Sequence, residues 1–355
     1  MAALTLIFFT MPATAREEIP LKAGRDWKHK HTGIAVPATL AATPRKIAIA
    51  YVPDDLDVGL SFSAGNDDES LSFYIFRNTN GGVPVWFAQA QWGIENRANF
   101  GSPKIALMPQ AFAPPRQSTR SGLKAIYQPS KGPYLSTGVL LLPVGDWYVK
   151  LRASSTTRSP SELEQWMEEA LGQIKWPKKV ANGPVAVPVY DCPMMLNFAA
   201  DAKDAEKDGA ADLLSGMLGM MVLKKEVKPT AEAQAALANA RWCRDASAGD
   251  NRQAYRRDEG ADRYLLAMGD NGIGAWIGAD SGAALLASAE KDPAKVKPPR
   301  YTVTIYTAQN NINYVAQDRM PSPKRVIELI DTDRRVTTVP TWGKKKEIQI
   351  NSDVL

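Results

Sequence analysis

Several residue types that commonly carry enzyme chemistry are scarce in this sequence. The 355 residues include only two histidines, His29 and His31, and two cysteines, Cys192 and Cys243. The histidines alternate with lysines in Lys28-His29-Lys30-His31, and the ammonium groups would repel a metal cation bound there. A Ser-His-Asp or Cys-His mechanism would have to use one of these two histidines. We therefore predict no catalytic residues of these classes, no metal site and no cofactor.

The phosphate-binding signatures of nucleotide enzymes are also missing. No Gly-x-x-x-x-Gly-Lys occurs, and Gly272, Gly274 and Gly278 have the wrong spacing for a dinucleotide fingerprint and lie within a strand pattern. Ser-x-x-Lys occurs at residues 121–124 and 288–291, as often as chance allows, without the other motifs of penicillin-binding proteins. These absences argue against a nucleotide cofactor. The position of the glycines within a strand pattern favours close packing of that strand against a neighbour.

Acidic residues gather at two expected turns, Asp54-Asp55-Leu56-Asp57 and Asn66-Asp67-Asp68-Glu69. Carboxylates on turns are the ligands that Ca²⁺ prefers, but neither group has the spacing of a twelve-residue calcium loop. We expect both groups to be solvated turns.

No apolar run approaches the ~20 residues that a membrane-spanning helix needs. Residues 2–13 form a shorter apolar stretch, followed by Ala13-Thr14-Ala15 and then by the polar Arg16-Glu17-Glu18. Such a stretch with a small-x-small end is typical of an export signal, although no Lys or Arg precedes it. The alternative is a buried N-terminal element of a cytoplasmic protein. We expect residues 1–15 to be cleaved, which leaves a periplasmic or secreted protein with no membrane span.

The cysteines point to the same compartment. In an oxidising environment, an even pair of cysteines that lie about fifty residues apart indicates one disulfide. We therefore predict a bond between Cys192 and Cys243, with two buried free thiols as the alternative.

Positive charge is concentrated in the first half of the chain. The net charge is +5; residues 16–180 carry 20 Lys/Arg against 15 Asp/Glu, whereas residues 181–355 carry 23 of each. Such a bias favours an anionic envelope component as the partner, or another envelope protein, and it is too weak to indicate nucleic acid. The alternative is a solvated surface with no partner. The basic residues chosen as candidate contacts are Lys22, Arg25, Lys28, Lys30, Arg116 and Arg120.

The length predicts two domains. The fold class expected is α+β, in which each domain is a mainly antiparallel sheet of short strands with one or two packed helices. The boundaries follow from composition: a signal at 1–15, a polar lead-in at 16–32, a first domain at 33–176, a Pro-rich linker at 177–189 and a second domain at 190–355, which contains the disulfide.

Alternating apolar residues predict six strands in the first domain. They span residues 46–52, 58–63, 71–77, 123–128, 136–142 and 147–153. In the last of these, Trp147, Val149 and Leu151 share one face, and Tyr148, Lys150 and Arg152 share the other. Residues 84–98 look helical, and residues 107–122 read as a Pro-bearing loop. Ser159 and Glu162 form a capping box, and Pro160 is the first residue of an amphipathic helix that ends before Trp176-Pro177.

The second domain contains two predicted hairpins. Residues 264–268 and 273–277 flank Asp270-Asn271-Gly272, and Asn-Gly is the strongest short signal for a two-residue type I′ turn. Residues 301–307 and 312–317 are expected to turn at Asn310-Asn311.

Three functional classes fit these observations. The first is an exported bacterial cell-envelope protein that binds, scaffolds or assists without catalysis. The second is a hydrolase or transferase that acts on an envelope polymer through carboxylate, Lys or Tyr side chains. The third is a membrane-peripheral role through residues 217–225, which are rich in Met and end in two lysines. The composition favours the first class.

Overall fold

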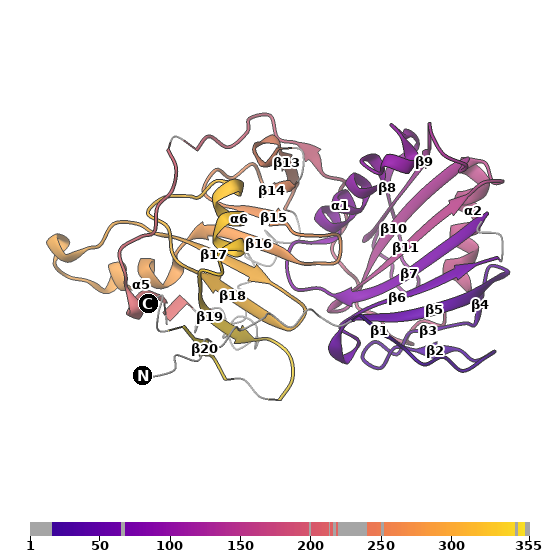
Figure 1. Cartoon of the computed structure of the whole chain (residues 1–355), viewed down its shortest axis with the longest axis horizontal. Coiled ribbons are helices and arrows are strands. Elements are labelled where there is room, and N and C mark those ends of the chain that lie inside the picture. The colour runs from indigo at the N-terminus through magenta and orange to yellow at the C-terminus, as the bar shows by residue number, and fades with distance from the viewer. Residues whose placement is uncertain are drawn as a thin grey trace, which may run out of the picture.

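The computed structural model describes residues 16–64, 68–198, 200–212, 214–215, 218, 240–249, 252–344 and 347–351. The expected export signal at residues 1–15 lies outside the described residues, as does almost all of the Met-rich segment at 217–225. Within the described part of the chain, no helix is both long and apolar enough to cross a membrane. Two antiparallel sheets with few helices dominate the fold, which confirms the α+β prediction (Figure 1).

The first domain is a nine-stranded antiparallel sheet in the order β1-β5-β6-β7-β11-β10-β9-β8, with β4 paired to β5. Its strands are β1 (Glu17–Glu18), β4 (Thr39–Leu40), β5 (Thr43–Val52), β6 (Asp57–Ser63), β7 (Glu69–Arg77), β8 (Lys104–Phe112), β9 (Gly122–Gln128), β10 (Ser136–Val144) and β11 (Trp147–Ser155). A 3₁₀ turn, η1 (Pro53–Asp55), joins β5 to β6. The six predicted strands are confirmed as β5, β6, β7, β9, β10 and β11.

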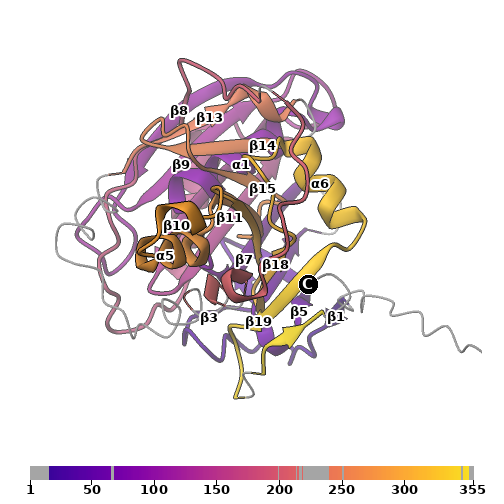
Figure 2. The ribbon, with the colours of Figure 1, turned by 90° about the vertical axis from the view of Figure 1, so that its left-hand side faces the viewer.

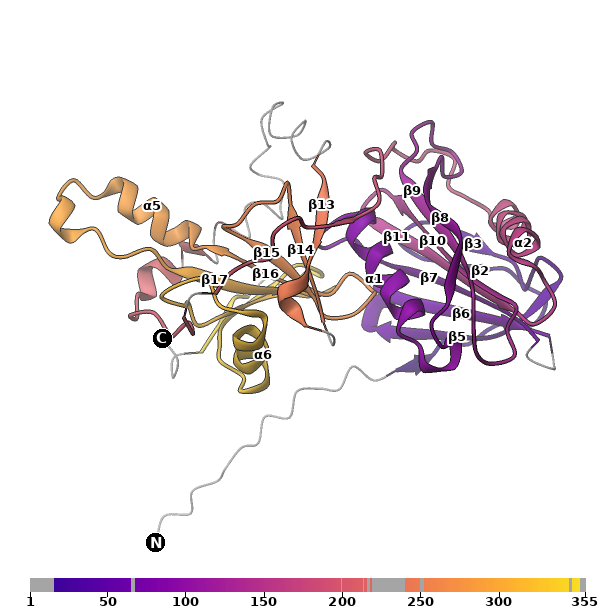
Figure 3. The same cartoon turned by 90° about the horizontal axis from the view of Figure 1, so that it is seen from above.

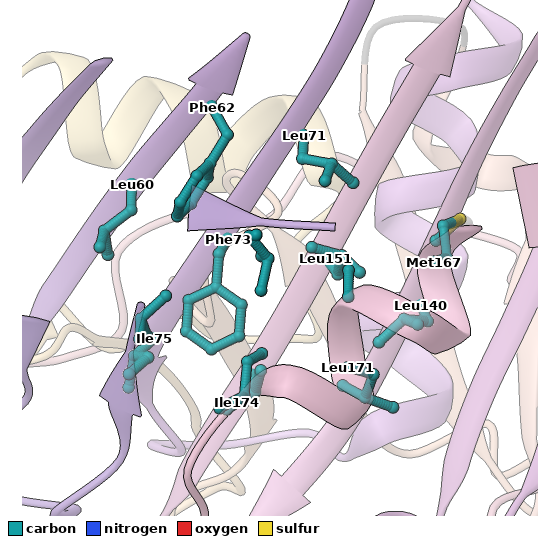
Figure 4. Packing of buried hydrophobic residues seen from close by; sticks show 14 of the residues in the cluster. Leu60, Phe62, Leu71, Phe73, Ile75, Leu140, Leu151, Met167, Leu171 and Ile174 are labelled. Carbon is teal, nitrogen blue, oxygen red and sulfur yellow. The ribbon is translucent and has the colours of Figure 1, made fainter. Parts of the chain in front are cut away.

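Two helices cover opposite faces of this sheet (Figure 3): α1 (Val83–Glu95) and α2 (Pro160–Gln173). Because side chains alternate along a strand, Leu140 and Leu142 of β10 belong to the core beneath α2, whereas Val139 and Leu141 belong to the core beneath α1. Figure 4 shows the first of these cores, with Met167 of α2 facing strand side chains. The same alternation places Lys150 and Arg152 on the α1 face, as the sequence predicts.

The capping box of α2 is confirmed. The Ser159 hydroxyl accepts the backbone N–H of Glu162, and the Glu162 carboxylate accepts the N–H of Ser159. We expect Ser159→Ala to lower the free energy of unfolding by about 1 kcal/mol, because the helix loses a partner for one of its free N–H groups. Guanidinium denaturation of both proteins would measure this, and an unchanged midpoint with an unchanged slope would contradict the assignment.

Residues 16–32, expected as a polar lead-in outside the domain, lie instead against the first sheet. β1 pairs with β5, and β2 (Trp27–Lys28) pairs with β3 (Ala35–Val36). His29 is fully buried, and its ring meets that of Trp147 edge to face. Three apolar residues of the segment contact the core beneath α2: Ile19, Leu21 and Trp27. Their wide spacing among charges hides them from an average over composition.

The prediction of a loop over residues 107–122 is wrong for its first part, because β8 continues to Phe112. β8 is the last strand of the sheet order and pairs with β9 through two register shifts. Met108 is 67% exposed there, and Pro109 lies within the strand. An edge strand tolerates a proline because one of its sides has no ladder to complete.

The second domain is a nine-stranded sheet in sequence order from β12 to β20, antiparallel except for the parallel pair β12 and β13. Its elements are β12 (Tyr190–Asp191), β13 (Trp242–Asp245), η3 (Ala246–Ala248), β14 (Gln253–Arg257), β15 (Tyr264–Ala267), β16 (Gly274–Ala279), α5 (Ser281–Ala289), η4 (Pro293–Lys295), β17 (Tyr301–Tyr306), β18 (Asn310–Tyr314), α6 (Pro323–Asp331), β19 (Arg335–Pro340) and β20 (Gln349–Ile350). The predicted disulfide is present, joining Cys192 to Cys243 beside the β12–β13 pair, with the two Cα atoms 4.9 Å apart.

Both hairpins are present, but their turns differ from the predicted ones. Residues 268–273 separate β15 from β16, and of Asn271 and Gly272 only the glycine has a positive φ, of 86°. A two-residue type I′ turn is therefore wrong here. In the second hairpin, Asn310 already belongs to β18, because the Thr307 side chain closes the turn by accepting the N–H groups of Gln309 and Asn310.

Both domains contact the helix α1, which therefore buries side chains around most of its circumference. Its buried residues are Val83, Val85, Trp86, Phe87, Gln89, Ala90 and Ile94. Tyr255 and Leu265 of the second sheet belong to the same core as Trp86, and the Tyr255 hydroxyl donates to the Gln89 side chain over 3.2 Å. The two sheets therefore share a core across α1. The helix lies between them in Figure 1 and behind the second sheet in Figure 2.

Candidate functional site

Polar side chains alternate with core residues along neighbouring strands of the first sheet, on the face that α1 covers in part. Ser72 of β7 is paired with Arg152 of β11, and Ser70 with Ser154. β10 pairs with the other side of β11, where Thr137 lies opposite Ser154. Because directly paired residues point to the same face, the register gathers these hydroxyl groups and a guanidinium into one patch.

A cavity of about 260 Å³ lies over this patch. The residues that line it are Ser70, Ser72, Tyr74, Ile94, Arg97, Asn99, Phe100, Tyr134, Thr137, Gly138, Arg152, Ala153 and Ser154. This set contains two arginines, several hydroxyl groups and an amide, and no carboxylate. Arginine forks match the geometry of carboxylate and phosphate groups, so the lining favours an anion. We call this cavity the hydroxyl pocket.

Arg152 connects the hydroxyl pocket to the rest of the molecule. Its Nη2 donates to the Asp270 carboxylate over 2.6 Å and to the Ala90 carbonyl of α1 over 3.3 Å. Its Nε is buried and has no hydrogen-bond partner within the described part of the chain. The side chain is 24% exposed and lines the hydroxyl pocket, so the guanidinium is held by Asp270 and α1 but remains partly accessible.

The opposite wall of the hydroxyl pocket comes from the chain after α1. The turn η2 (Ala98–Phe100) buries Phe100, whose ring meets that of Tyr134 edge to face at 5.8 Å. The Arg97 guanidinium lies over the same Phe100 ring at 5.1 Å. This stacking holds a second, exposed cation at the rim, where it can reach a ligand.

A buried ionic cluster lies beside the pocket on the same face. Lys150 is 3% exposed, and its Nζ donates to the Asp270 carboxylate over 2.7 Å and to the Asp270 carbonyl over 2.9 Å. The ammonium also lies over the ring of Tyr74 at 4.8 Å. Burial alone would raise the pKa of Asp270, but Lys150 and Arg152 lower it to about 2. Lys150 is thus held away from a substrate by its burial and by its two contacts to Asp270.

Asp57 at the start of β6 belongs to the same cluster. Its carboxylate accepts a hydrogen bond from the Asn271 side chain over 2.8 Å and is almost fully buried. Burial raises the pKa of Asp57 to about 6, although the Asn271 bond and the charge of Lys150 oppose the shift. Asp57 is therefore no solvated turn residue, whereas Asp54 and Asp55 do form ion pairs with Lys30 at the surface.

The six basic residues predicted from composition are all exposed, and none lines the hydroxyl pocket. The lead-in that carries Lys22, Arg25, Lys28 and Lys30 lies beside β5. Arg116 and Arg120 are in the β8–β9 loop, where the Arg120 guanidinium donates to the Ala111 carbonyl. Six strand spacings separate β5 from β8, or roughly 29 Å. The structure therefore does not bring the two groups together.

Other features offer less chemistry. A second hollow, of about 740 Å³, lies beside α5, and its lining is mostly small apolar residues together with both acids and bases. In the first Ser-x-x-Lys sequence, the Ser121 hydroxyl donates to Gln117, and Lys124 is paired with Glu164 and Glu168. Among the described residues, no group of three or more His, Cys, Asp or Glu side chains could hold a metal ion.

Comparison with known proteins adds no assignment. No protein-family model, curated protein or solved structure matches this chain. The geometry of the hydroxyl pocket therefore carries the functional argument.

The sequence prediction placed Arg152 on the correct face but missed the pocket. The signal was present in the alternation Ser70-Leu71-Ser72-Phe73, where small hydroxyl residues alternate with core residues. A strand that faces plain solvent more often presents charged or long polar side chains there. These serines lie beside Arg152 only because β7 pairs with β11. The paired residues Ser72 and Arg152 are about 80 residues apart in the sequence, so local patterns do not reveal the contact.

Proposed function

We propose that this protein is an exported binding module whose hydroxyl pocket takes a sugar-sized ligand that carries one anionic group, a carboxylate or a phosphate. The single observation that supports this proposal most is the composition of the pocket wall: Arg97 and Arg152 line it together with several hydroxyl groups, and the lining itself contains no acid. Serine and threonine hydroxyls both donate and accept, as sugar hydroxyls do. The pocket is smaller than the 300–1,000 Å³ that drug-sized ligands occupy, which favours a single ring.

Binding is favoured over catalysis by the side chains in the pocket. General acid–base chemistry needs a group that exchanges its proton near the working pH, most often His, Asp, Glu or Lys. The lining supplies none of these, and the nearby Lys150 and Asp57 are buried in contacts of their own. Its two tyrosines have aromatic contacts, Tyr74 with the Lys150 ammonium and Tyr134 with the Phe100 ring, and the lining has no acid, histidine or lysine that could take a proton from them. We therefore favour a binding or accessory role over a hydrolase or transferase.

Two observations support a place outside the cytoplasm. The first is the apolar stretch at residues 2–13 with its small-x-small end. The second is the disulfide between Cys192 and Cys243, since such bonds persist mainly in oxidising compartments. Acidic and phosphorylated sugars are common components of bacterial envelope polymers, and the proposal places the protein among the accessories of such a polymer.

The test is calorimetric titration of the mature chain with D-glucuronate, D-glucose 6-phosphate and neutral D-glucose. We expect both anions to bind and glucose to bind at least about tenfold more weakly, because a charge-assisted arginine bond contributes about 1.5–3 kcal/mol. Arg152→Gln should weaken the anions by about 10- to 100-fold. Arg319→Gln removes the same charge from an exposed position of the second domain and serves as the matched control. If neither anion binds, the proposal is overturned.

The six surface bases test a separate prediction. Substitution of Lys22, Arg25, Lys28, Lys30, Arg116 and Arg120 by Gln should lower affinity for an anionic polymer at low salt only. Long-range attraction falls as the Debye length shrinks from about 10 Å at 0.1 M to about 3 Å at 1 M. Glucuronate binding should be nearly unaffected, because these residues lie outside the hydroxyl pocket. If the substitutions lowered the affinities for glucuronate and for the polymer equally, the pocket would not be the specific site.

A further inference from the structure

The turn between β15 and β16 docks into the first domain beside α1 (Figure 3). Three consecutive residues form this tip: Asp270, Asn271 and Gly272. Each has its own partner: Lys150 and Arg152 hold Asp270, Asp57 accepts from Asn271, and the Gly272 carbonyl accepts from Thr79 over 3.0 Å and Asn80 over 2.8 Å. The fit is close, since a Cβ at Gly272 would lie 3.0 Å from the Arg77 carbonyl. The docked tip is thus a specific contact between the domains.

Among the residues that the structure describes, Arg152 both holds the docked tip through Asp270 and lines the hydroxyl pocket. The Asp270 carboxylate lies 2.6 Å from Nη2, where it neutralises much of the charge that Arg152 would otherwise present to the pocket. An anion in the pocket and the Asp270 carboxylate therefore draw on the same guanidinium. Two anions that share one cation weaken each other's binding, because their charges repel and because each neutralises part of the charge that attracts the other.

We propose that the second domain regulates the hydroxyl pocket, because docking of the Asp270–Gly272 tip and binding of the anionic ligand compete for Arg152. This inference rests on the proposed function and adds to it a link between the two domains. Undocking of the tip strengthens anion binding. By thermodynamic linkage, an anion in the pocket loosens the tip by the same factor. The protein thus presents its second domain differently when the ligand is bound.

Other groups around Arg152 do not replace Asp270. The Ala90 carbonyl accepts from the same Nη2 at 3.3 Å but carries no full charge. Lys150, which shares the Asp270 carboxylate, is held away from the pocket by Tyr74 and Phe76, with its ammonium 4.8 Å and 5.4 Å from their ring centres. Asp270 is therefore the side chain whose removal changes what Arg152 offers to a ligand.

The experiment measures D-glucuronate affinity and amide hydrogen exchange of residues 268–273 in the mature wild-type chain, in Asp270→Asn and in Thr79→Ala. Thr79→Ala weakens the docked tip without changing its charge, and it keeps the test available where Asp270→Asn folds poorly. Asp201→Asn, an exposed carboxylate of the same domain, is the control for net charge. We expect Asp270→Asn to bind glucuronate about tenfold more tightly than the wild type, within the range typical of coupled sites. Thr79→Ala should show a smaller gain and Asp201→Asn almost none.

Saturating glucuronate should also speed exchange at residues 268–273 of the wild type. Equal affinity in the wild type, Asp270→Asn and Thr79→Ala, together with exchange that ignores the ligand, would overturn the coupling and leave the proposed function standing. If no anion binds any of the proteins, the proposed function fails, and the coupling fails with it. The two failures are therefore distinguishable.

Discussion

Reduction of the Cys192–Cys243 bond should lower the free energy of unfolding of the second domain by about 4 kcal/mol. The bond closes a loop of 51 residues, and chain-entropy arguments assign this size of effect to a loop of that length. The local structure does little to replace it, because β12 is two residues long and pairs only with β13. Guanidinium denaturation with and without a reductant would measure the difference.

The matched control is the double variant Cys192→Ser and Cys243→Ser. It should unfold at or slightly below the midpoint of the reduced wild type, and reductant should not shift it further. Cys243 is fully buried, so a serine there adds a small cost of its own. A wild-type midpoint that does not respond to full reduction would show that the bond adds nothing to stability. A large response would mean that the second domain needs an oxidising compartment, in line with the proposed export.

Local rules were sufficient for most of the first domain. The strands β6, β7 and β11 were predicted because Leu60, Phe73 and Val149 belong to alternations that bury one face. The helix α2 was predicted because its cap, its first proline and its apolar stripe agree with one another. The edge strand β8 was missed because it buries little, so its pattern lacks the alternation that a buried face imposes. Elements that bury one face could therefore be predicted from the sequence, whereas the exposed edge strand could not.

The candidate site could not be predicted in the same way. Its key contact joins Arg152 to Asp270, 118 residues apart and in different domains. The sequence identified the Asp270-Asn271-Gly272 turn and assigned it the geometry of an isolated hairpin. The first domain instead supplies the partners of these residues, so the turn is longer and only Gly272 has a positive φ. A contact across domains has overridden the local preference at this position.

The histidines show the same limit from the other direction. Lys28-His29-Lys30-His31 belongs to the segment that the sequence predicts as a polar lead-in. In the structure the rings of both histidines contact Trp147, and His31 also contacts Trp342 of the second domain. Because Trp147 and Trp342 are distant in the sequence, the residues around His29 give no indication of these contacts. Composition therefore described the charge of this segment correctly but not its burial.

Asp57→Asn should make the protein more stable at pH 7.5 by up to about 3 kcal/mol. Burial raises the pKa of Asp57 from an ordinary 3.8 to about 6, so the folded state holds this proton more tightly than the unfolded state does. The contribution of Asp57 to stability is then fully present below pH 3.8, and it is lost as the pH rises through about 6. Each pH unit between these values corresponds to about 1.4 kcal/mol. At pH 7.5 the wild type carries a buried, ionised carboxylate, and asparagine removes that cost while it still accepts the hydrogen bond from Asn271.

The difference between Asp57→Asn and the wild type should therefore shrink toward zero as the pH falls to 4. Asp270 does not confuse this comparison, because its pKa of about 2 keeps it ionised throughout the range. Asp201→Asn, at an exposed site, should follow the wild type at every pH. Denaturation midpoints of the three proteins between pH 4 and 7.5 decide the matter. A variant that is less stable than the wild type at pH 7.5 would mean that Lys150 attracts the ionised Asp57 more strongly than burial opposes it. The docked tip would then depend on the charge of Asp57 rather than tolerate it.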